Sequence, residues 1–553
     1  MFHALFYFAL THLLWSSAGL LFFCKYASAR DVWNMPWPVA PYHSYMDIVP
    51  MRFDSPAGLT SLNFSFSAMK TKDACPGRDI YIIFANARLP LVDISQNSLP
   101  EYFVEPSQPG VEVVVQPGQM AEVSLIRPPP GPWYIGGYLR GIDQDIRQKG
   151  LNQDKACRYL YMFLAKLAEP VKATRILPGD EISTTIDTDG SSFSFTVSPR
   201  TVNFEVQVMQ CKPGPCNISL SYLSFISKEV VEDCSSEVNS TLPSCALHIS
   251  SPPLNDLHIV KIKFMGDDTQ NLQKREVVFK VLVQECLPLE LGLTPLSCGL
   301  TAALDRVQSP FPQATMFSMV NTMSMSLMTD LMSAKVIAIP FTIKEPNDVG
   351  GTLKWEMHVL LFSNITASYQ QVCGGLIYNK LPDTSLTGLD LCSEDIPGAV
   401  NLKYPVSLEL GPEKRSIKRY VPYPQTGQWF IVLQTHCFAD DSLTEIDCGD
   451  RVLVEMLLEI QRCVDTECSG NGRCDLTTRG SDFVTYSACV CDAEYRGYGC
   501  TDGRYAQSTT VQLAGAYLLT LSNLAFVPAI ILSIRRGFFV EAFVYFYNMF
   551  FST

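Results

Sequence analysis

Residues 128–135 read Pro-Pro-Pro-Gly-Pro-Trp-Tyr-Ile, and residues 424–431 read Pro-Gln-Thr-Gly-Gln-Trp-Phe-Ile. The two stretches share the pattern Pro-x-x-Gly-x-Trp-aromatic-Ile, although they lie far apart in the chain. Pro and Gly favour turns, and aromatic and β-branched residues favour strands, so the pattern predicts a turn that enters a strand. We expect the large aromatic side chain to face a hydrophobic core. The alternative is a pair of aromatic platforms that hold a ligand.

Strand-like runs precede both copies of this pattern. They occupy residues 111–115, 122–126, 406–410 and 417–421. Similar short runs of β-branched and aromatic residues lie at 192–197, 203–208, 276–284 and 354–361, separated by turn signals. Such spacing predicts a mainly β ectodomain of tandem, jelly-roll-like antiparallel β-sandwiches. We place three sandwiches, at residues 31–170, 171–300 and 301–460.

The composition excludes two broad classes of protein. Of the 553 residues, 47% are hydrophobic and only 18% are charged, below the ~25% that is usual for soluble domains. An intrinsically disordered chain is therefore excluded. The net charge is −13, from 55 acidic and 42 basic residues without a long basic run. A nucleic-acid partner is not expected, because binding phosphates requires clustered Lys and Arg.

The amino-terminal stretch is typical of a secretory signal. Residues 2–23 carry no charge, and Ala27-Ser28-Ala29 follow a few residues later. A small-x-small triplet after an apolar run is the pattern at which signal peptides are cleaved, so we assign residues 1–29 as a signal peptide. The alternative is a signal anchor that stays in place, because the run is long enough to span a membrane.

A second long apolar stretch lies near the carboxyl end. Residues 511–534 are uncharged and long enough to cross the ~30 Å hydrocarbon core as a helix. Arg535 and Arg536 follow, and basic residues beside a span favour the cytosol, so the preceding residues are expected outside the cell or in a lumen. Residues 537–553 form another apolar run, which we interpret as an incomplete second transmembrane helix.

The cysteines fit an oxidising compartment. Removing Cys24 with the signal peptide leaves 18 of the 19 cysteines, an even number. Twelve of them form even groups that can pair within their own regions, in an order that the sequence leaves open. These are Cys75 and Cys157; Cys211, Cys216, Cys234, Cys245, Cys286 and Cys298; and Cys373, Cys392, Cys437 and Cys448.

The remaining six cysteines crowd into residues 463–500 and resemble an EGF-like module. So short a segment cannot bury enough apolar surface to fold without staples. The resemblance implies the pairs Cys463–Cys474, Cys468–Cys489 and Cys491–Cys500. Bound zinc is the alternative for closely spaced cysteines, but an oxidising compartment disfavours it. No calcium is expected, because Ile460-Gln461-Arg462 stands where calcium-binding modules carry acidic residues.

Four Asn-x-Ser/Thr motifs are candidate N-glycosylation sites, and each is expected in a surface loop. They lie at Asn63, Asn217, Asn239 and Asn364.

The residues between 30 and 510 show no pattern that is typical of an enzyme. The histidines there are dispersed, without metal-binding spacing or a nucleophile elbow, so this part is interpreted as a binding or structural unit without a metal or cofactor.

The layout as a whole resembles the transmembrane protein 8 family. Residues 517–528 read Tyr-Leu-Leu-Thr-Leu-Ser-Asn-Leu-Ala-Phe-Val-Pro, followed by Arg535-Arg536 and Glu-Ala-Phe-Val-Tyr at 541–545. These residues resemble the family's first span and the start of its second. The family includes a GPI-specific phospholipase A2, which removes an acyl chain from the GPI lipid and releases the anchored protein.

The resemblance implies a catalytic residue at Ser552. The family's membrane part resembles metal-dependent hydrolases that combine a Ser, an Asp and three His. Of these five residues only the Ser is present here, so a metal ion such as zinc is expected only in a full-length family member. Metal-assisted hydrolysis needs several ligands around one ion. We therefore expect a carboxyl-terminally truncated family member, and no lipase activity if these 553 residues are the whole product.

Two functional hypotheses follow. The first is a membrane glycoprotein of the GPI-phospholipase type, with the lipid bilayer and GPI-anchored proteins as partners. The second is a cell-surface adhesion or receptor-like protein with an EGF-like module. For either, we expect the plasma membrane with an extracellular ectodomain, or an endosomal or lysosomal membrane.

Overall fold

The computed structural model describes most of the chain from residue 31 onward. The described residues are 31–33, 35–92, 110–140, 157–186, 189–212, 217–223, 230–235, 245–254, 256–265, 276–286, 300–301, 303–308, 315–318, 327–331, 336–345, 348–360, 369–381, 406–410, 416–439, 444–446, 452–464 and 468–551. The expected signal peptide at residues 1–29 lies outside them.

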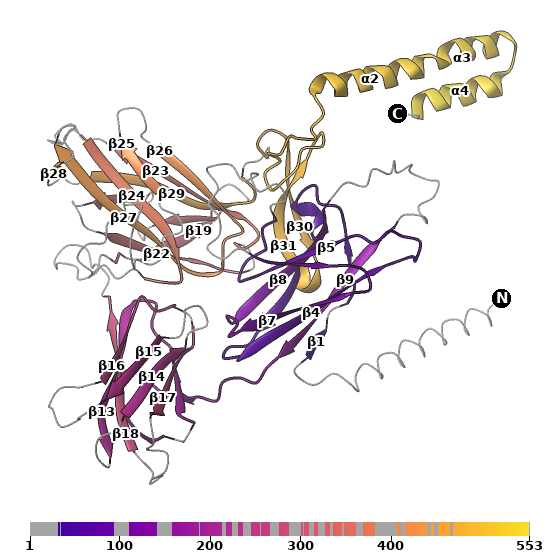
Figure 1. The fold of residues 1–553 in the computed structure, drawn as a ribbon. Coiled ribbons are helices and arrows are strands. Elements are labelled where there is room, and N and C mark those ends of the chain that lie inside the picture. Colours follow the sequence, from indigo (N-terminus) through magenta and orange to yellow (C-terminus); the bar gives the residue numbers. More distant parts are fainter. Residues whose placement is uncertain are drawn as a thin grey trace.

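The first sandwich packs two antiparallel sheets face to face (Figure 1). One sheet runs β1 (Asp31–Trp33), β9 (Tyr159–Leu167), β4 (Ser61–Lys70) and β7 (Met120–Ile126), with β2 (Trp37–Val39) also paired to β9. The other runs β3 (Met51–Ser55), β8 (Gly131–Leu139), β5 (Ile80–Asn86) and β6 (Val111–Val115). The short 3-10 helix η1 (Tyr45–Asp47) precedes β3.

The second sandwich repeats this arrangement. One sheet runs β11 (Glu181–Thr185), β18 (Glu276–Glu285), β13 (Thr201–Lys212) and β16 (Cys245–Ser250). The other runs β10 (Thr174–Arg175), β12 (Ser191–Phe195), β17 (His258–Phe264), β14 (Asn217–Leu223) and β15 (Val230–Ser235). Buried and less buried residues alternate along β14, as expected for a strand with one face on a core.

The third sandwich is the largest. One sheet runs β19 (Asp305–Gln308), β20 (Thr315–Ser318), β29 (Val452–Gln461), β23 (Thr352–Leu360) and β26 (Ser416–Pro422), with β21 (Leu327–Leu331) also paired to β29. The other runs β22 (Ile337–Ile343), β27 (Gly427–Ala439), β24 (Tyr369–Tyr378) and β25 (Val406–Leu410), with β28 (Thr444–Ile446) on β27.

All three sandwiches share one topology, which confirms the predicted jelly-roll class. Counted in chain order within a sandwich, the main strands pair as 1-8-3-6 in one sheet and 2-7-4-5 in the other. The two Trp residues of the repeated pattern begin equivalent strands. Trp133 is 5% exposed in the first core and Trp429 is 2% exposed in the third, so the prediction of core packing is confirmed.

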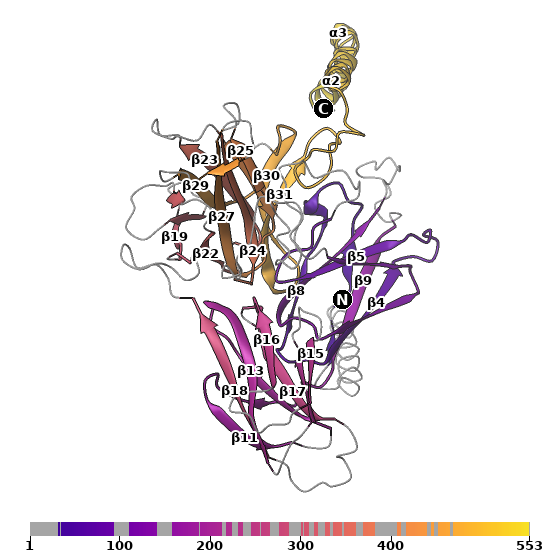
Figure 2. The same cartoon turned by 60° about the vertical axis from the view of Figure 1, so that its left-hand side comes forward.

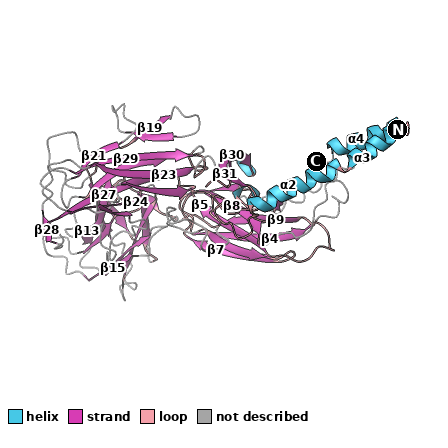
Figure 3. Cartoon of the chain, turned by 90° about the horizontal axis from the view of Figure 1, so that it is seen from above, coloured by secondary structure: helices cyan, strands magenta, loops and turns pink. Residues whose placement is uncertain are grey.

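A disulfide-rich hairpin and a helical segment complete the chain. Strands β30 (Gly472–Arg479) and β31 (Val484–Cys491) pair around the 3-10 helix η5 (Ser481–Phe483). This hairpin lies between the first and third sandwiches in both views (Figures 1 and 2). The helices α2 (Thr509–Leu524), α3 (Phe526–Arg535) and α4 (Phe539–Phe551) project away from the sandwiches, as Figure 3 shows from above.

Two of the four candidate glycosylation sites can be placed. Asn63 lies in β4 and Asn217 begins β14, and both side chains are exposed. The expectation that they lie in loops is wrong, because both belong to strands with a solvent-facing side. Their exposure still leaves room for a glycan. Asn239 and Asn364 lie outside the described residues.

Candidate functional site at the membrane-facing end

Helices α2 and α3 form a segment that can cross a membrane. Together they span Thr509–Arg535, 27 residues, and none of the segment is buried against the rest of the described chain. At ~1.5 Å per residue this gives a helix of about 40 Å, longer than the ~30 Å hydrocarbon core. Leu518 is 67% exposed and Leu521 60%. Such exposed apolar surface is unfavourable in water, so the segment is suited to lipid.

The sequence explains both ends of α2. Ser508 caps the first turn, where its hydroxyl accepts a hydrogen bond from the Val511 N–H at 3.4 Å. At the other end, Ala525 separates α2 from α3. Pro528 follows in the first turn of α3, and because it has no N–H it cannot donate to the carbonyl four residues earlier. The sequence therefore explains why the helix is interrupted between α2 and α3.

A tight turn reverses the chain after α3. Gly537 adopts a left-handed φ of +78°, which a glycine tolerates at a helix end. The N–H of Phe538 donates to the Ser533 carbonyl at 2.9 Å, and α4 then packs back along α3. The predicted second run at residues 537–553 thus contains α4, whose 13 residues reach about 20 Å.

The implied catalytic residue, Ser552, lies outside the described residues. Among the described residues, no histidine joins a group that could bind a metal. His43 contacts Asp47, His358 contacts Glu356, and His258 is buried in the second sandwich against Tyr222. Over the described ranges, only one group of three His, Cys, Asp or Glu side chains could meet at a metal ion, and it consists of cysteines. The described residues therefore supply no His and carboxylate set for the metal that the family resemblance implies.

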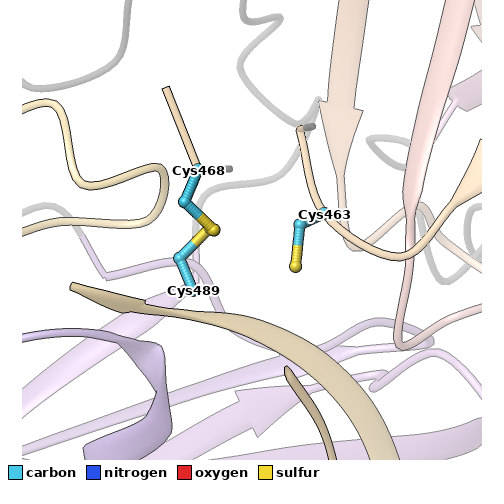
Figure 4. Close-up of side chains that lie close together, drawn as sticks. All are labelled: Cys463, Cys468 and Cys489. Carbon is cyan, nitrogen blue, oxygen red and sulfur yellow. A yellow bond between two sulfur atoms is a disulfide. The ribbon is translucent and has the colours of Figure 1, made fainter. Parts of the chain in front are cut away.

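That cysteine group is Cys463, Cys468 and Cys489, whose sulfur atoms lie within 4.8 Å of one another. Figure 4 shows the disulfide bond between Cys468 and Cys489, with Cys463 beside it. The Cys463 sulfur is bonded to Cys474. A metal needs a free thiolate, and none of these three sulfurs is one, so the group is a staple.

The disulfide pattern of residues 463–500 equals the one that the EGF-like resemblance implies. The bonds are Cys463–Cys474, Cys468–Cys489 and Cys491–Cys500. Two further pairs lie in the first and second sandwiches, Cys75–Cys157 and Cys234–Cys245. All of these bonds precede the membrane helix in the chain.

The disulfide module, residues 463–500, is held by both neighbouring sandwiches. The Tyr486 hydroxyl donates to the Ile48 carbonyl of the first sandwich at 2.7 Å. The Tyr423 hydroxyl of the third sandwich donates to the Ser487 carbonyl at 2.9 Å. Tyr498 shares a 2.7 Å hydrogen bond with Thr352. These tyrosine side chains join one buried cluster that spans the three units, so the module is a wedge between them.

Charged groups tighten the same junction. Arg52 of the first sandwich contacts Glu345 of the third at 3.1 Å, and the Tyr134 hydroxyl also donates to Glu345. Nearby, the Gly497 N–H of the module donates to the His43 carbonyl at 3.0 Å. The hydrogen bond with Asp47 raises the pKa of His43 above its usual value, while partial burial and Arg496 oppose that shift.

Comparison with known proteins gives family matches for the third sandwich and for the helical segment. Residues 304–463 match the family model described as the PGAP6/TMEM8 beta-sandwich domain, and residues 511–553 match a family described as a protein of unknown function, DUF3522. The human protein "Post-GPI attachment to proteins factor 6" is 26% identical over 524 residues, which cover 87% of this chain. Its mouse counterpart is 25% identical over 94% of this chain. Human "Transmembrane protein 8B" is 35% identical over 37% of this chain.

The chain is similar to the transmembrane protein 8 family in its third sandwich, in its helical segment and over most of its length. It accordingly combines β-sandwich domains with a helix that can cross a membrane. The match covers 64% of the human and 69% of the mouse factor 6, and 41% of human transmembrane protein 8B. The chain therefore spans about two thirds of the length of the two factor 6 relatives.

Sequence reasoning missed the residues that join the three units. Four tyrosines come from distant parts of the chain, yet their rings meet tilted or edge to face, with centroids 4.6 to 5.6 Å apart: Tyr45, Tyr423, Tyr486 and Tyr498. A tyrosine in a β-rich chain is common, and no local pattern marks these four. Tyr423 has a left-handed φ of +47°, but this is a property of the folded backbone that the sequence does not show.

Proposed function

We propose that this chain acts in the processing of GPI-anchored proteins, with an ectodomain that engages such proteins at the outer or luminal membrane surface. The supporting observation is the order of the two family matches. The sandwich domain at 304–463 and the membrane segment at 511–553 flank the disulfide module, which is wedged between two sandwiches. This packing fixes the first and third sandwiches relative to the module that leads into the membrane helix.

The relatives support the class of partner. Two of them are named as factors that act after GPI attachment to proteins. For this chain we propose that the GPI-anchored protein is held by the ectodomain while its lipid remains beside α2 and α3. The disulfide bonds that precede the helix support an extracellular or luminal ectodomain, since such bonds persist in oxidising compartments.

Acyl-chain removal is the finer activity that the family resemblance implies. We propose that these 553 residues, expressed as they stand, do not perform that step. The reason is chemical: hydrolysis of this type needs a nucleophile and several metal ligands around one point. The described residues bring together no such set, since their only candidate ligand group is a set of disulfide-bonded cysteines.

Two reporters with the same protein part test the proposed partner. One carries a GPI anchor and the other a transmembrane helix, and each is co-expressed with this chain. After gentle detergent extraction, the chain is precipitated and both reporters are quantified. We expect preferential recovery of the GPI-anchored reporter. Equal recovery would instead favour the adhesion or receptor-like hypothesis, in which the protein part is recognised.

Reporter release tests the proposed inactivity. Cells that express the GPI-anchored reporter with or without this chain are compared for reporter in the medium, and a bacterial phosphatidylinositol-specific phospholipase serves as the positive control. We expect release at background level. Release that depends on this chain and disappears in Ser552→Ala would overturn the proposal and assign catalysis to the chain.

A further inference from the structure

The three sandwiches share a backbone corner that the repeated sequence pattern only partly reveals. In each, the sixth strand is followed by a residue with left-handed φ and then by a proline; these residues are Arg127 at +51°, Ser251 at +46° and Tyr423 at +47°. The N–H of each donates to a carbonyl at the start of the third strand. These acceptors are Thr60 at 3.0 Å, Val202 at 2.8 Å and Gly351 at 3.0 Å. We call the left-handed residue and the residues up to the next strand the corner.

The aromatic ring after each corner is equivalent as well. The Trp133 indole N–H donates to the Pro129 carbonyl at 3.3 Å, and that of Trp429 donates to the Gln425 carbonyl at 2.8 Å. Both acceptors directly follow the corner proline. In the second sandwich His258 opens the equivalent strand and lies seven positions after the left-handed residue, whereas each Trp lies six positions after it.

The residue three positions after the left-handed residue is the one that matters for contacts between sandwiches. In the first and third sandwiches its carbonyl is held from within. Asn86 Nδ2 donates to the Pro130 carbonyl at 3.4 Å, and the Tyr378 hydroxyl donates to the Thr426 carbonyl at 2.8 Å. Asn86 and Tyr378 both end the fourth strand of their sandwich. With the Thr426 carbonyl fixed inward, the N–H of Thr426 is available to a neighbour, whereas Pro130 has no N–H.

The N–H groups at this position donate across domain boundaries in the same way twice. The Thr426 N–H of the third sandwich donates to the Ala87 carbonyl of the first at 2.9 Å. The Leu254 N–H of the second sandwich donates to the Asn379 carbonyl of the third at 2.8 Å. Thr426 and Leu254 occupy the same corner position, and Ala87 and Asn379 follow the same strand.

The two acceptor residues have the same left-handed backbone conformation. Ala87 has a φ of +58° and Asn379 a φ of +57°, although neither is glycine. Each uses its own N–H inside its sandwich, to the Pro132 carbonyl at 2.6 Å and the Gln428 carbonyl at 2.8 Å. The left-handed backbone leaves the acceptor carbonyl turned toward the neighbouring sandwich. Ala87 is 5% and Asn379 8% exposed, so both contacts are shielded from water.

From this repetition we infer that one docking contact, used twice, assembles the ectodomain head to tail. On one side, the carbonyl of the left-handed residue after the fourth strand accepts a hydrogen bond. On the other side, a backbone N–H in the corner of another sandwich donates it. The second sandwich docks on the third, and the third docks on the first. This inference concerns the ectodomain alone and does not depend on the proposed function.

The first sandwich ends the series. Its corner carries Pro130 at the position of Thr426 and Leu254, and proline has no N–H to donate. The corner that would continue the array is therefore unable to form the contact. A chain built from docking sandwiches gains from such an end, because an open donor would invite pairing with further molecules.

Amide hydrogen–deuterium exchange of the full chain in detergent micelles tests the inference. In the wild-type chain, peptides that cover Leu254 and Thr426 are expected to exchange as slowly as strand amides. Exchange at the rate of an exposed loop at either position would overturn the inference before any variant is made.

Matched variants then test each contact separately. Ala87→Val places a β-branched residue at left-handed φ, whereas Ala87→Asn is similar in size and tolerates that backbone, as Asn379 shows. We expect Ala87→Val to speed exchange at Thr426 by about tenfold while Leu254 stays protected, and Ala87→Asn to leave both unchanged. Asn379→Val is expected to act on Leu254 alone, with Asn379→Gly as its control.

The pattern of responses decides the outcome. If Ala87→Val and Ala87→Asn behave alike, the left-handed acceptor has no role in docking and the inference is wrong. If either valine variant deprotects both peptides equally, the effect is general destabilisation, which also contradicts two independent contacts. Pro130→Thr is expected to leave both peptides protected.

Discussion

The first and third sandwiches place a tryptophan at the start of the seventh strand, and the second sandwich places His258 there. All three rings are buried in their cores, and His258 contacts Phe195, Phe204 and Tyr222 much as the tryptophans contact their aromatic neighbours. An indole cannot change its charge in the physiological range, whereas an imidazole can. One fold therefore recurs three times with the same corner, but only the second copy has a titratable ring at this place.

Burial has a marked effect on that ring. Desolvation lowers the pKa of His258 from 6.5 to about 4, with the Pro253 backbone acting in the opposite direction. The neutral ring shares a 2.7 Å hydrogen bond between Nδ1 and the Tyr222 hydroxyl. At this position, mild acid is therefore expected to affect the core of the second sandwich and not the cores of the first and third.

The largest effect is expected where the ring itself is removed. Trp429→Ala should lower the free energy of unfolding of the third sandwich by about 4 kcal/mol, because it deletes a large, fully buried side chain and leaves a cavity. Trp133→Ala should do the same to the first sandwich. Chemical denaturation, monitored in each sandwich by amide hydrogen–deuterium exchange, measures both changes.

The conservative substitution checks the cause. Trp429→Phe keeps most of the apolar volume but loses the indole N–H that donates to the Gln425 carbonyl. It should cost clearly less than Trp429→Ala. Equal losses for the two variants would show that packing of the ring is not what stabilises this corner.

A smaller effect is expected from acid, and only in the second sandwich. The pKa of His258 is lower in the folded state than in the unfolded state, so the unfolded chain binds the proton first as the pH falls. Stability is therefore complete above the unfolded value of 6.5 and declines toward the folded value of about 4. Between pH 7.5 and pH 5 the second sandwich should lose about 2 kcal/mol.

A variant without the titratable ring provides the control. The double variant His258→Phe with Tyr222→Phe removes the imidazole and also avoids an unpaired buried hydroxyl. Its stability should not decline through this mechanism between pH 7.5 and pH 5, as measured by urea denaturation at each pH. A decline as steep as in the wild-type chain would assign the acid sensitivity to other groups.

The smallest effect is expected at the glycines that directly follow two of the corners. Gly427 has a φ of +127° and an added Cβ would contact the Tyr378 ring at 3.3 Å, whereas Gly131 has a φ of +98° with open space around it. Gly427→Ala should cost about 1 to 2 kcal/mol from backbone strain, and Gly131→Ala should cost less because no neighbour has to move. Thermal unfolding of both variants measures the difference, and a larger loss in Gly131→Ala would contradict this reading.

The sequence predicts this fold well wherever the signal is local. The alternating runs at 111–115 and 406–410 are strands with those bounds, β6 and β25. The repeated Pro-x-x-Gly-x-Trp pattern locates two equivalent strands. The copy in the second sandwich escapes the pattern because His258 replaces the tryptophan and lies one position further from the left-handed residue.

The candidate site is less predictable, for a physical reason. The apolar length of α2 and α3 is a local property, and the expected span of 511–534 differs from Thr509–Arg535 by only a few residues. The wedge of the disulfide module depends instead on contacts such as Tyr486 with Ile48, which join distant residues through one hydrogen bond to the backbone. Backbone acceptors carry no mark in the sequence.

The claim at the centre of this comparison is that one corner recurs three times and that only its second copy titrates. Amide exchange of the full chain at pH 7.5 and pH 5, corrected for the intrinsic effect of pH, tests it most directly. We predict that β14 and β17 lose protection at pH 5 while β8 and β27 keep theirs. Equal protection of all four strands at pH 5, or a joint loss in all of them, would contradict the account.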